Sequence, residues 1–267
     1  MCATDERSLK EAYQKQGYLI LKGMLSSNEI AHLSALVEPI YQAWFEENEA
    51  LIFKHKLLNM HSLTKPDYFT EKPENRLALF NAIAHPKLIQ VAQSVFGDGL
   101  YFHNTQLFFN PTNCERLPYW HRDMQYSPFS DVELEAVLES MINLHFRIPL
   151  IKETGIELIP GTHKRWDKIL EKQVRLERDG HHNNEPLEDA ILLELEVGDV
   201  LIFNAQMLHR GNYDLNLERK ALDVCIGKYH EFTAPALEEA CLPPLEELGE
   251  IKHNTWYQRA LEVVRKK

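Results

Sequence analysis

An alternation of apolar and mainly polar residues between positions 142 and 151 sets the strongest limit on the fold. Every second side chain is apolar, at Ile142, Leu144, Phe146, Ile148 and Leu150. Successive side chains of a β-strand point to opposite faces, so the pattern predicts a strand with one apolar and one polar face. His145 and Arg147 fall on the polar face of this strand.

Shorter β-type runs occur elsewhere in the chain. They lie at about 18–21, 100–109, 118–123, 156–159, 190–197, 200–204 and 221–229. With the alternating stretch they make about eight short strands, which are joined by loops and few helices. This pattern predicts a mainly β fold, a double-sheet jelly roll or a cupin-like barrel, rather than a parallel βαβ sheet.

The first hundred residues have helical signals instead. Ser26 and Glu29 have the spacing of a capping box, and so do Ser8 and Glu11. In this motif the two side chains satisfy backbone N–H groups at the start of a helix, so a helix is expected to begin at each pair. Residues 75–97 are expected to form two further short helices.

No repeat or linker-like boundary divides the chain. We therefore expect a single domain over residues 1–267. It would combine a helical N-terminal layer at about 1–98, a β core at about 99–230 and a last helix at about 254–265.

The chain is acidic, with 29 Lys and Arg against 40 Asp and Glu and a formal net charge of −11. It lacks the basic footprint that binds phosphate backbones or anionic lipid, so neither nucleic acid nor a membrane is an expected partner. The N-terminal residues include no apolar leader segment, and a cytoplasmic location is expected. The four cysteines are isolated and are expected to be reduced. No protein partner is inferred.

His121 and Asp123 in the sequence YWHRD form a candidate metal-binding pair. On an extended segment, side chains two residues apart point the same way. His209 is the candidate third ligand, because it follows the buried run at 200–204 and precedes a glycine. Two histidines and one carboxylate are the facial set of non-haem Fe(II) enzymes, which leaves three coordination positions open. Zinc accepts the same three ligands.

Four motifs follow one another along the chain. They are YWHRDMQYSPF at the candidate pair, TGIELIPGTHKRWD at 154–167, GDVLIFNAQMLHRG at 198–211 and ERKALDV at 218–224. Together with the opening GYLILKGMLSSNEI at 17–30, they resemble the phytanoyl-CoA dioxygenase family from residue 17 to about residue 227. The resemblance implies an Fe(II)- and 2-oxoglutarate-dependent oxygenase, which uses O2, on a double-stranded β-helix.

The family pattern, carried over residue by residue, makes His121, Asp123 and His209 the iron ligands and the catalytic centre. It makes Arg219 the residue that binds the distal carboxylate of 2-oxoglutarate, a role that suits a charged, bidentate guanidinium. Arg219 shares a strand face with small or polar residues, whereas Lys220 falls on the apolar face.

The chain departs from the family pattern near the expected cosubstrate site. Gly211 stands where related enzymes often place a hydroxyl residue two positions after the distal histidine. The remaining cosubstrate contacts are therefore open. The candidates on neighbouring strands are Asn104, Gln106, Asn143 and His145.

Two charged segments, 130–140 and 163–189, interrupt the β-region. Such excursions commonly act as lids, and plain solvated insertions are the alternative interpretation. A lid over residues 164–189 would lie at the open end of the barrel, near the metal.

The expected function is hydroxylation of a C–H bond in a small molecule, coupled to decarboxylation of 2-oxoglutarate to succinate. Two alternatives remain on the same fold. One is a cupin-like metal-dependent isomerase or hydrolase, and the other is a non-catalytic metal-binding module. The identity of the substrate is open, because a fold does not fix a function.

Overall fold

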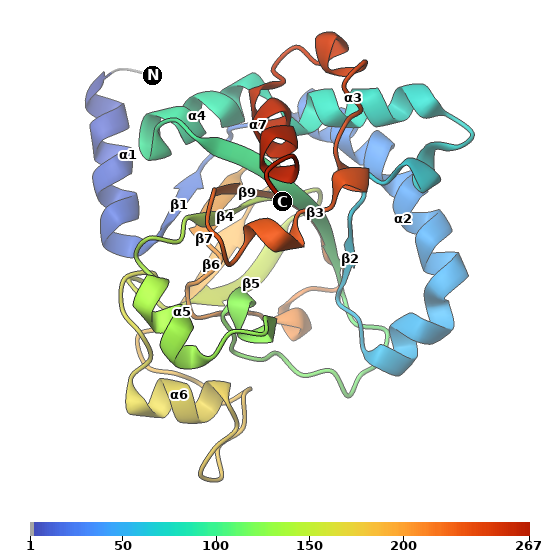
Figure 1. Cartoon of the computed structure of the whole chain (residues 1–267). Helices are drawn as coiled ribbons and strands as arrows, with labels where there is room; N and C mark the ends of the chain where they lie inside the picture. Colours follow the sequence, from blue (N-terminus) through green and yellow to red (C-terminus); the bar gives the residue numbers. More distant parts are fainter. Residues whose placement is uncertain (1–2) are drawn as a thin grey trace.

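Two antiparallel sheets form the centre of the computed structural model, which describes residues 3–267 (Figure 1). In sheet order, the larger sheet contains β1 (Tyr18–Leu21), β7 (Val200–Asn204), β4 (Asn143–Pro149), β9 (Lys220–Lys228), β3 (Leu100–Phe109) and β2 (Asn59–His61). The smaller sheet contains β6 (Ile191–Leu195), β5 (Glu153–Leu158) and β8 (His209–Gly211). The sheets pack face to face without closing into one barrel, and the predicted jelly-roll fold is confirmed.

Seven α-helices surround the sheets in the described part of the chain. They are α1 (Ala3–Gln16), α2 (Ser27–His55), α3 (Pro73–Ile83), α4 (Pro86–Phe96), α5 (Asp131–Val137), α6 (Ile169–Arg175) and α7 (Thr255–Val264). Short 3-10 turns connect several of the elements. Helices from the N-terminal third and α7 pack on the larger sheet, on the face away from the smaller sheet.

The alternation along β4 separates the two environments of the larger sheet. Leu144, Phe146 and Ile148 belong to the core under the helices, where the Phe146 ring meets Trp256 of α7 edge to face. The residues between them, including His145 and Arg147, point toward the space between the two sheets. The predicted strand with one apolar and one polar face is confirmed, and its polar face is the one that faces the cavity described below.

Three local expectations differ from the structure. Residues 118–123 are extended but form no strand, and only His121 makes an isolated bridge, to His209. Pro118 has no N–H to donate, and the Trp120 N–H donates to a loop carbonyl at Asn183. Strands β2 and β8 were not expected, because three residues are too few to show a period. Helix α1 begins at Ala3, so Ser8 lies inside it rather than at its start.

The capping box at Ser26 is present and starts α2. The Ser26 hydroxyl accepts from the Glu29 N–H, and the Glu29 carboxylate accepts from the Ser26 N–H. The same carboxylate pairs with His85 and Lys87, each at 2.9 Å. These contacts, with the backbone hydrogen bond from Ser26 the largest, lower the pKa of Glu29 to about 2. Glu29 therefore ties the start of α2 to the start of α4.

Glu29→Gln is expected to lower the free energy of unfolding at pH 7 by about 0.5–1 kcal/mol, the usual cost of a lost cap. The folded-state pKa lies below the ordinary value of 4.5, so the stabilisation is complete above that pH and disappears as the pH falls toward 2. Urea titrations between pH 7 and pH 3 should show the difference between wild type and variant shrinking. Glu49→Gln, on the exposed side of the same helix, is the control. A pH-independent loss in Glu29→Gln would contradict the role of its charge.

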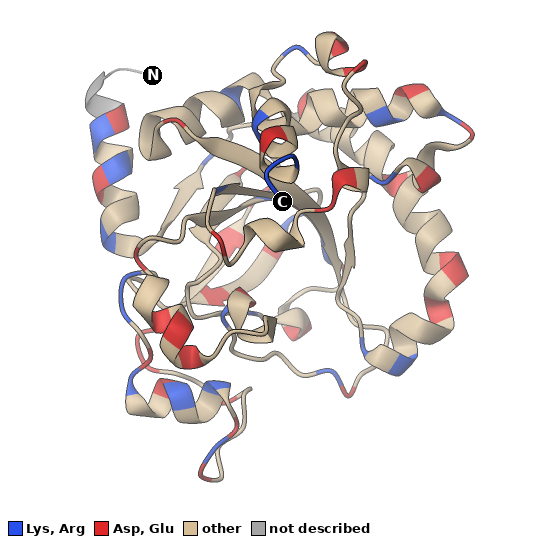
Figure 2. Ribbon diagram, in the orientation of Figure 1, with Lys and Arg blue, Asp and Glu red and all other residues tan. Residues whose placement is uncertain are grey.

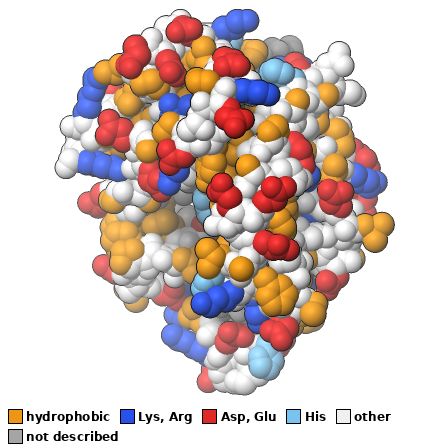
Figure 3. Space-filling view, turned by 90° about the vertical axis from the view of Figure 1, so that its right-hand side faces the viewer, with side chains coloured by type: hydrophobic (Ala, Val, Ile, Leu, Met, Phe, Trp, Pro, Cys, Tyr) orange, Lys and Arg blue, Asp and Glu red, His pale blue; other side chains and the backbone are white. Residues whose placement is uncertain are grey.

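Charged residues lie mainly on the outer helices and loops, where Lys and Arg are interspersed with Asp and Glu (Figure 2). Among residues 3–267, no helix combines the length and the apolar character that a bilayer span requires. The side of the molecule that carries α2 and β2 is hollowed near its middle, and histidine side chains show beside the hollow (Figure 3).

Candidate metal centre

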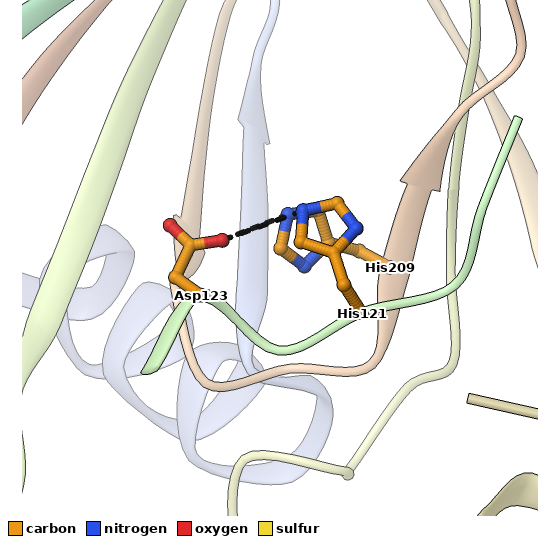
Figure 4. A group of neighbouring side chains, drawn as sticks. All are labelled: His121, Asp123 and His209. Carbon is orange, nitrogen blue, oxygen red and sulfur yellow. Dashed lines mark ion pairs between the residues drawn. The ribbon is translucent and has the colours of Figure 1, made fainter. Parts of the chain in front are cut away.

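His121, Asp123 and His209 lie together at one end of the space between the sheets (Figure 4). The backbones of His121 and His209 exchange two hydrogen bonds, at 3.0 and 3.1 Å, which set the two imidazoles side by side. Asp123 follows on the same side of the extended segment as His121. One potential ligand atom from each residue lies within 4.8 Å of the other two. The three predicted ligands are thus brought together by one backbone bridge and one i, i+2 spacing.

Backbone carbonyls fix which ring nitrogen of each histidine faces the cluster. The Nδ1 atoms of His121 and His209 lie 3.1 and 2.9 Å from the carbonyls of Tyr119 and Met207. A carbonyl only accepts, so each Nδ1 carries the proton and each Nε2 presents a lone pair. The two Nε2 atoms face Asp123 Oδ1 at 3.5 and 3.4 Å. The three free lone pairs therefore converge on one point.

The electrostatic environment favours the protonation states that bind a metal. Burial, with a contribution from His121, lowers the pKa of His209 to about 3, and burial also lowers the pKa of His121. Burial opposes the ionisation of Asp123, but His145 and the two cluster histidines outweigh it, so the pKa of Asp123 lies well below its usual value. Two neutral imidazoles and one carboxylate are donors that Fe(II) and Zn(II) both accept without losing a proton first.

A cavity of about 370 Å³ opens beside the cluster. Both sheets contribute to its wall, for example through Phe108 of β3, Arg147 of β4 and Ile156 of β5. Gln106 lines the cavity, and its side-chain oxygen accepts from Asn59 at 2.7 Å. Asn104 does not line it, because its side-chain oxygen turns back to accept from the Thr105 N–H beside a bulge in β3. Of the two predicted β3 candidates, the structure brings only Gln106 to the cavity.

Arg219 lies in the same cavity wall, one residue before β9, and only 3% of the residue is exposed. Its Nε donates to Glu153, and its guanidinium lies over the rings of Phe108 and Tyr213. Its Nη1 is buried and has no hydrogen-bond partner among the described residues. A buried, unpaired guanidinium nitrogen is costly unless an acceptor reaches it. A hydrogen-bond acceptor that enters the cavity is therefore expected to pair with this N–H group.

The neighbours of Arg219 explain two features of the sequence. Lys220 points the other way and pairs with Glu38 of α2 at 2.8 Å, as the alternation of the strand predicts. Gly211 provides the space for the guanidinium. A Cβ atom at position 211 would lie 2.9 Å from the Tyr213 ring and 3.0 Å from Arg219 Nη2.

The 164–189 insertion does not line the cavity. It packs behind the metal-bearing segment, where Trp120 donates to the carbonyls of Asn183 and Glu185, each at 2.8 Å. Arg122 is buried and donates to Asp167 of the insertion. Because alternate side chains of an extended segment point in opposite directions, His121 and Asp123 face the cavity while Trp120 and Arg122 anchor the insertion. The insertion thus supports the segment from outside rather than covering the cavity.

Sequence reasoning missed a set of charged residues beside the cluster. They are Arg147 and the two buried acids that pair with it, Glu153 and Asp223. The period-two pattern places Arg147 and Asp223 on polar strand faces and could have indicated them. Glu153 gave no such signal, because it begins a strand outside any clear alternation.

Comparisons with known proteins show which family the chain is similar to. A profile of the phytanoyl-CoA dioxygenase (PhyH) family matches residues 13–216. An ectoine dioxygenase of Bordetella bronchiseptica is 21% identical over 229 residues, which cover 77% of this chain and 70% of that protein. A phytanoyl-CoA dioxygenase, peroxisomal, of Rattus norvegicus is 20% identical over 221 residues, which cover 75% of this chain and 61% of that protein.

Among solved structures, EctD from S. alaskensis with 2-oxoglutarate and 5-hydroxyectoine superposes with a TM-score of 0.53 at 16% identity, covering 85% of this chain and 76% of that chain. These structural likenesses support the fold. The family profile spans most of the chain, and its range includes the three residues of the cluster and β7, the strand that precedes His209. The protein therefore belongs to the phytanoyl-CoA dioxygenase family.

Proposed function

We propose that the protein is an Fe(II)- and 2-oxoglutarate-dependent oxygenase that hydroxylates a C–H bond of a small molecule. In this proposal His121, Asp123 and His209 hold the iron, and Arg219 binds the distal carboxylate of 2-oxoglutarate. The observation that carries it is the unpaired, buried Nη1 of Arg219 in the same cavity as a two-histidine, one-carboxylate cluster. A metal-binding site alone has no need for this donor.

The residues of the cavity fit both groups. Two Nε2 atoms and Asp123 Oδ1 converge from one side, so coordination positions on the cavity side stay open. Iron with 2-oxoglutarate and O2 supplies the oxidation, in which 2-oxoglutarate becomes succinate and CO2 while one oxygen atom enters the substrate. The chain itself orients the cosubstrate through Arg219, and Gln106 is proposed as a further contact. The rings of Phe108 and Tyr213 shield the guanidinium from water.

A small molecule is the substrate class that the cavity supports. Its volume of about 370 Å³ lies at the low end of the range for ligand pockets and must also hold the cosubstrate. One relative is named for ectoine and another for phytanoyl-CoA. We propose a small substrate without choosing between these chemistries.

The test is anaerobic binding followed by turnover. Apo protein should bind 2-oxoglutarate tightly only when Fe(II) or Mn(II) is present, as measured by calorimetry. Admission of O2 with candidate substrates should then release succinate in proportion to hydroxylated product. Metal binding without 2-oxoglutarate binding would favour a metal-dependent isomerase or hydrolase. Binding of both without succinate from any substrate would favour a non-catalytic module.

Gly211→Ser is expected to weaken 2-oxoglutarate binding while leaving metal binding unchanged. The added side chain would press on Arg219 and the Tyr213 ring, so the guanidinium must shift from its place over Gly211. We expect a loss smaller than that caused by removing the guanidinium, because a flexible arginine can move part of the way. Calorimetric titration of 2-oxoglutarate into the Mn(II) protein measures it. Tighter binding in Gly211→Ser would show that a hydroxyl at this position assists the arginine.

A further inference from the structure

A chain of paired charges, all buried except Asp123, runs from the metal cluster to the candidate cosubstrate site. In order, its members are Asp123, His145, Asp223, Arg147, Glu153 and Arg219. Each pairs with the next at 3.0 Å or less. Asp123 belongs to the segment with the proposed metal ligands, and His145 and Arg147 belong to β4. Asp223 lies in β9 and Glu153 in β5, and Arg219 immediately precedes β9. No other set of ion pairs among the described residues joins these two ends of the cavity.

His145 is the link that touches the metal cluster. Its Nε2 lies 2.8 Å from Asp123 Oδ2, and its Nδ1 lies 2.8 Å from Asp223 Oδ2. Carboxylates only accept, so both ring nitrogens donate and the ring is held between the two acids. The ring also stacks on Phe203, with centroids 5.0 Å apart. These three contacts leave the imidazole no freedom to turn.

The bond from His145 decides which oxygen of Asp123 is free. Oδ2 is occupied by His145 Nε2, whereas Oδ1 faces the Nε2 atoms of His121 and His209. A carboxylate with both oxygens free can rotate about its χ2 angle, for which rotamer preferences are weak. The hydrogen bond from His145 removes this rotation and presents a single oxygen to the cluster.

Asp223 in turn is fixed from behind. Its second oxygen pairs with Arg147 at 3.0 Å, and Arg147 pairs with both oxygens of Glu153 at 2.7 and 2.8 Å. All three residues are almost fully buried. Buried charges are tolerated only when each has its partner, so the members of the chain hold one another in place.

We propose that His145 is a positioning residue, which holds Asp123 as a one-oxygen metal ligand and is itself anchored by Asp223. This inference rests on the ligand set of the proposed function. It does not require that the protein turn over 2-oxoglutarate.

Two variants at position 145 separate hydrogen bonding from packing. His145→Phe keeps a ring that can stack on Phe203 but donates no hydrogen bond. His145→Gln keeps one N–H that can reach Asp123. Outer partners of metal ligands typically contribute about 10–100-fold in metal affinity. We expect a loss of this size in His145→Phe for Mn(II) and Co(II) bound to the apo protein, and a smaller loss in His145→Gln. The Co(II) absorption spectrum should change in His145→Phe.

Cys225→Ala is the matched control. Its sulfur lies 4.0 Å from His145 Nδ1 at similar depth but belongs to no ion pair, so this variant should bind metal like wild type. Asp223→Asn should weaken metal binding in the wild-type background and add little in the His145→Phe background, because the two residues act as a unit. Thermal unfolding of the apo proteins verifies that each variant is folded.

The outcomes separate this inference from the proposed function. Wild-type metal affinity in a folded His145→Phe variant would overturn the positioning role, and so would an equal loss in Cys225→Ala. Equal losses in His145→Phe and His145→Gln would also contradict it, if both are folded. A wild-type protein that binds metal but never consumes 2-oxoglutarate would overturn the proposed function alone. A wild-type protein that binds no metal would overturn both.

Discussion

Arg219→Leu is expected to keep the metal and lose most of its affinity for 2-oxoglutarate. In the structure Arg219 Nη1 is buried without a partner, so the proposed distal carboxylate would be its acceptor. Removing one partner of a buried ion pair costs about 3–5 kcal/mol. At about 1.4 kcal/mol per decade, this corresponds to a loss of about a hundred-fold to a few thousand-fold in affinity. Titration of 2-oxoglutarate into the Mn(II) protein without O2 measures it.

The fold should tolerate this change, because Glu153 keeps its two hydrogen bonds to Arg147 when Arg219 is removed. Lys220→Leu is the matched control, since it removes the neighbouring positive charge, which pairs with Glu38 outside the cavity. Arg219→Lys keeps the charge without the planar fork and should fall between wild type and Arg219→Leu. Unchanged 2-oxoglutarate affinity in Arg219→Leu would remove the main reason for preferring an oxygenase over a generic metal-binding fold.

The parts of the fold that were predictable carry their own local signal. The alternation along β4 was visible because one face packs under helices and the other lines a polar cavity. The capping box at Ser26 starts α2 by itself. Strands β2 and β8 were not predictable, because each gains its extended shape only by pairing with β3 or β5. The order of strands in the sheets likewise depends on contacts between distant residues.

The candidate site likewise has residues that the sequence predicts and residues that it does not. His121 and Asp123 are neighbours in the sequence, and the strand before His209 brings that residue back toward them. The period-two pattern places Asp223 on a polar face but does not show its partner, since His145 and Asp223 are 78 positions apart and meet only because β4 pairs with β9. Asn104 lies outside the cavity wall, because the bulge in β3 and a local hydrogen bond from Thr105 turn its side chain back to the backbone. Period-two reasoning identifies the face of a residue but not the direction in which a short amide side chain turns.

His209→Ala is expected to abolish the stabilisation that a divalent metal gives to the protein. A ligand that binds only the folded state stabilises it by about 2.7 kcal/mol at a concentration 100 times its dissociation constant. Loss of a direct ligand should lower metal affinity by more than the about 100-fold that an outer partner contributes. The midpoint of thermal unfolding of wild type should therefore rise with added Mn(II), whereas that of His209→Ala should stay constant.

Without metal, His209→Ala should unfold close to wild type, because the bridge to His121 is made by backbone atoms that the substitution leaves in place. His61→Ala is the matched control, since His61 lines the same cavity but lies outside the cluster of three. The midpoint of thermal unfolding of His61→Ala should rise with Mn(II) as much as that of wild type. Suppose that Mn(II) raised the midpoint of thermal unfolding of His209→Ala but not that of His61→Ala. The metal would then be bound by a different set of residues, and the proposed role of Asp123 as its carboxylate ligand would be contradicted as well.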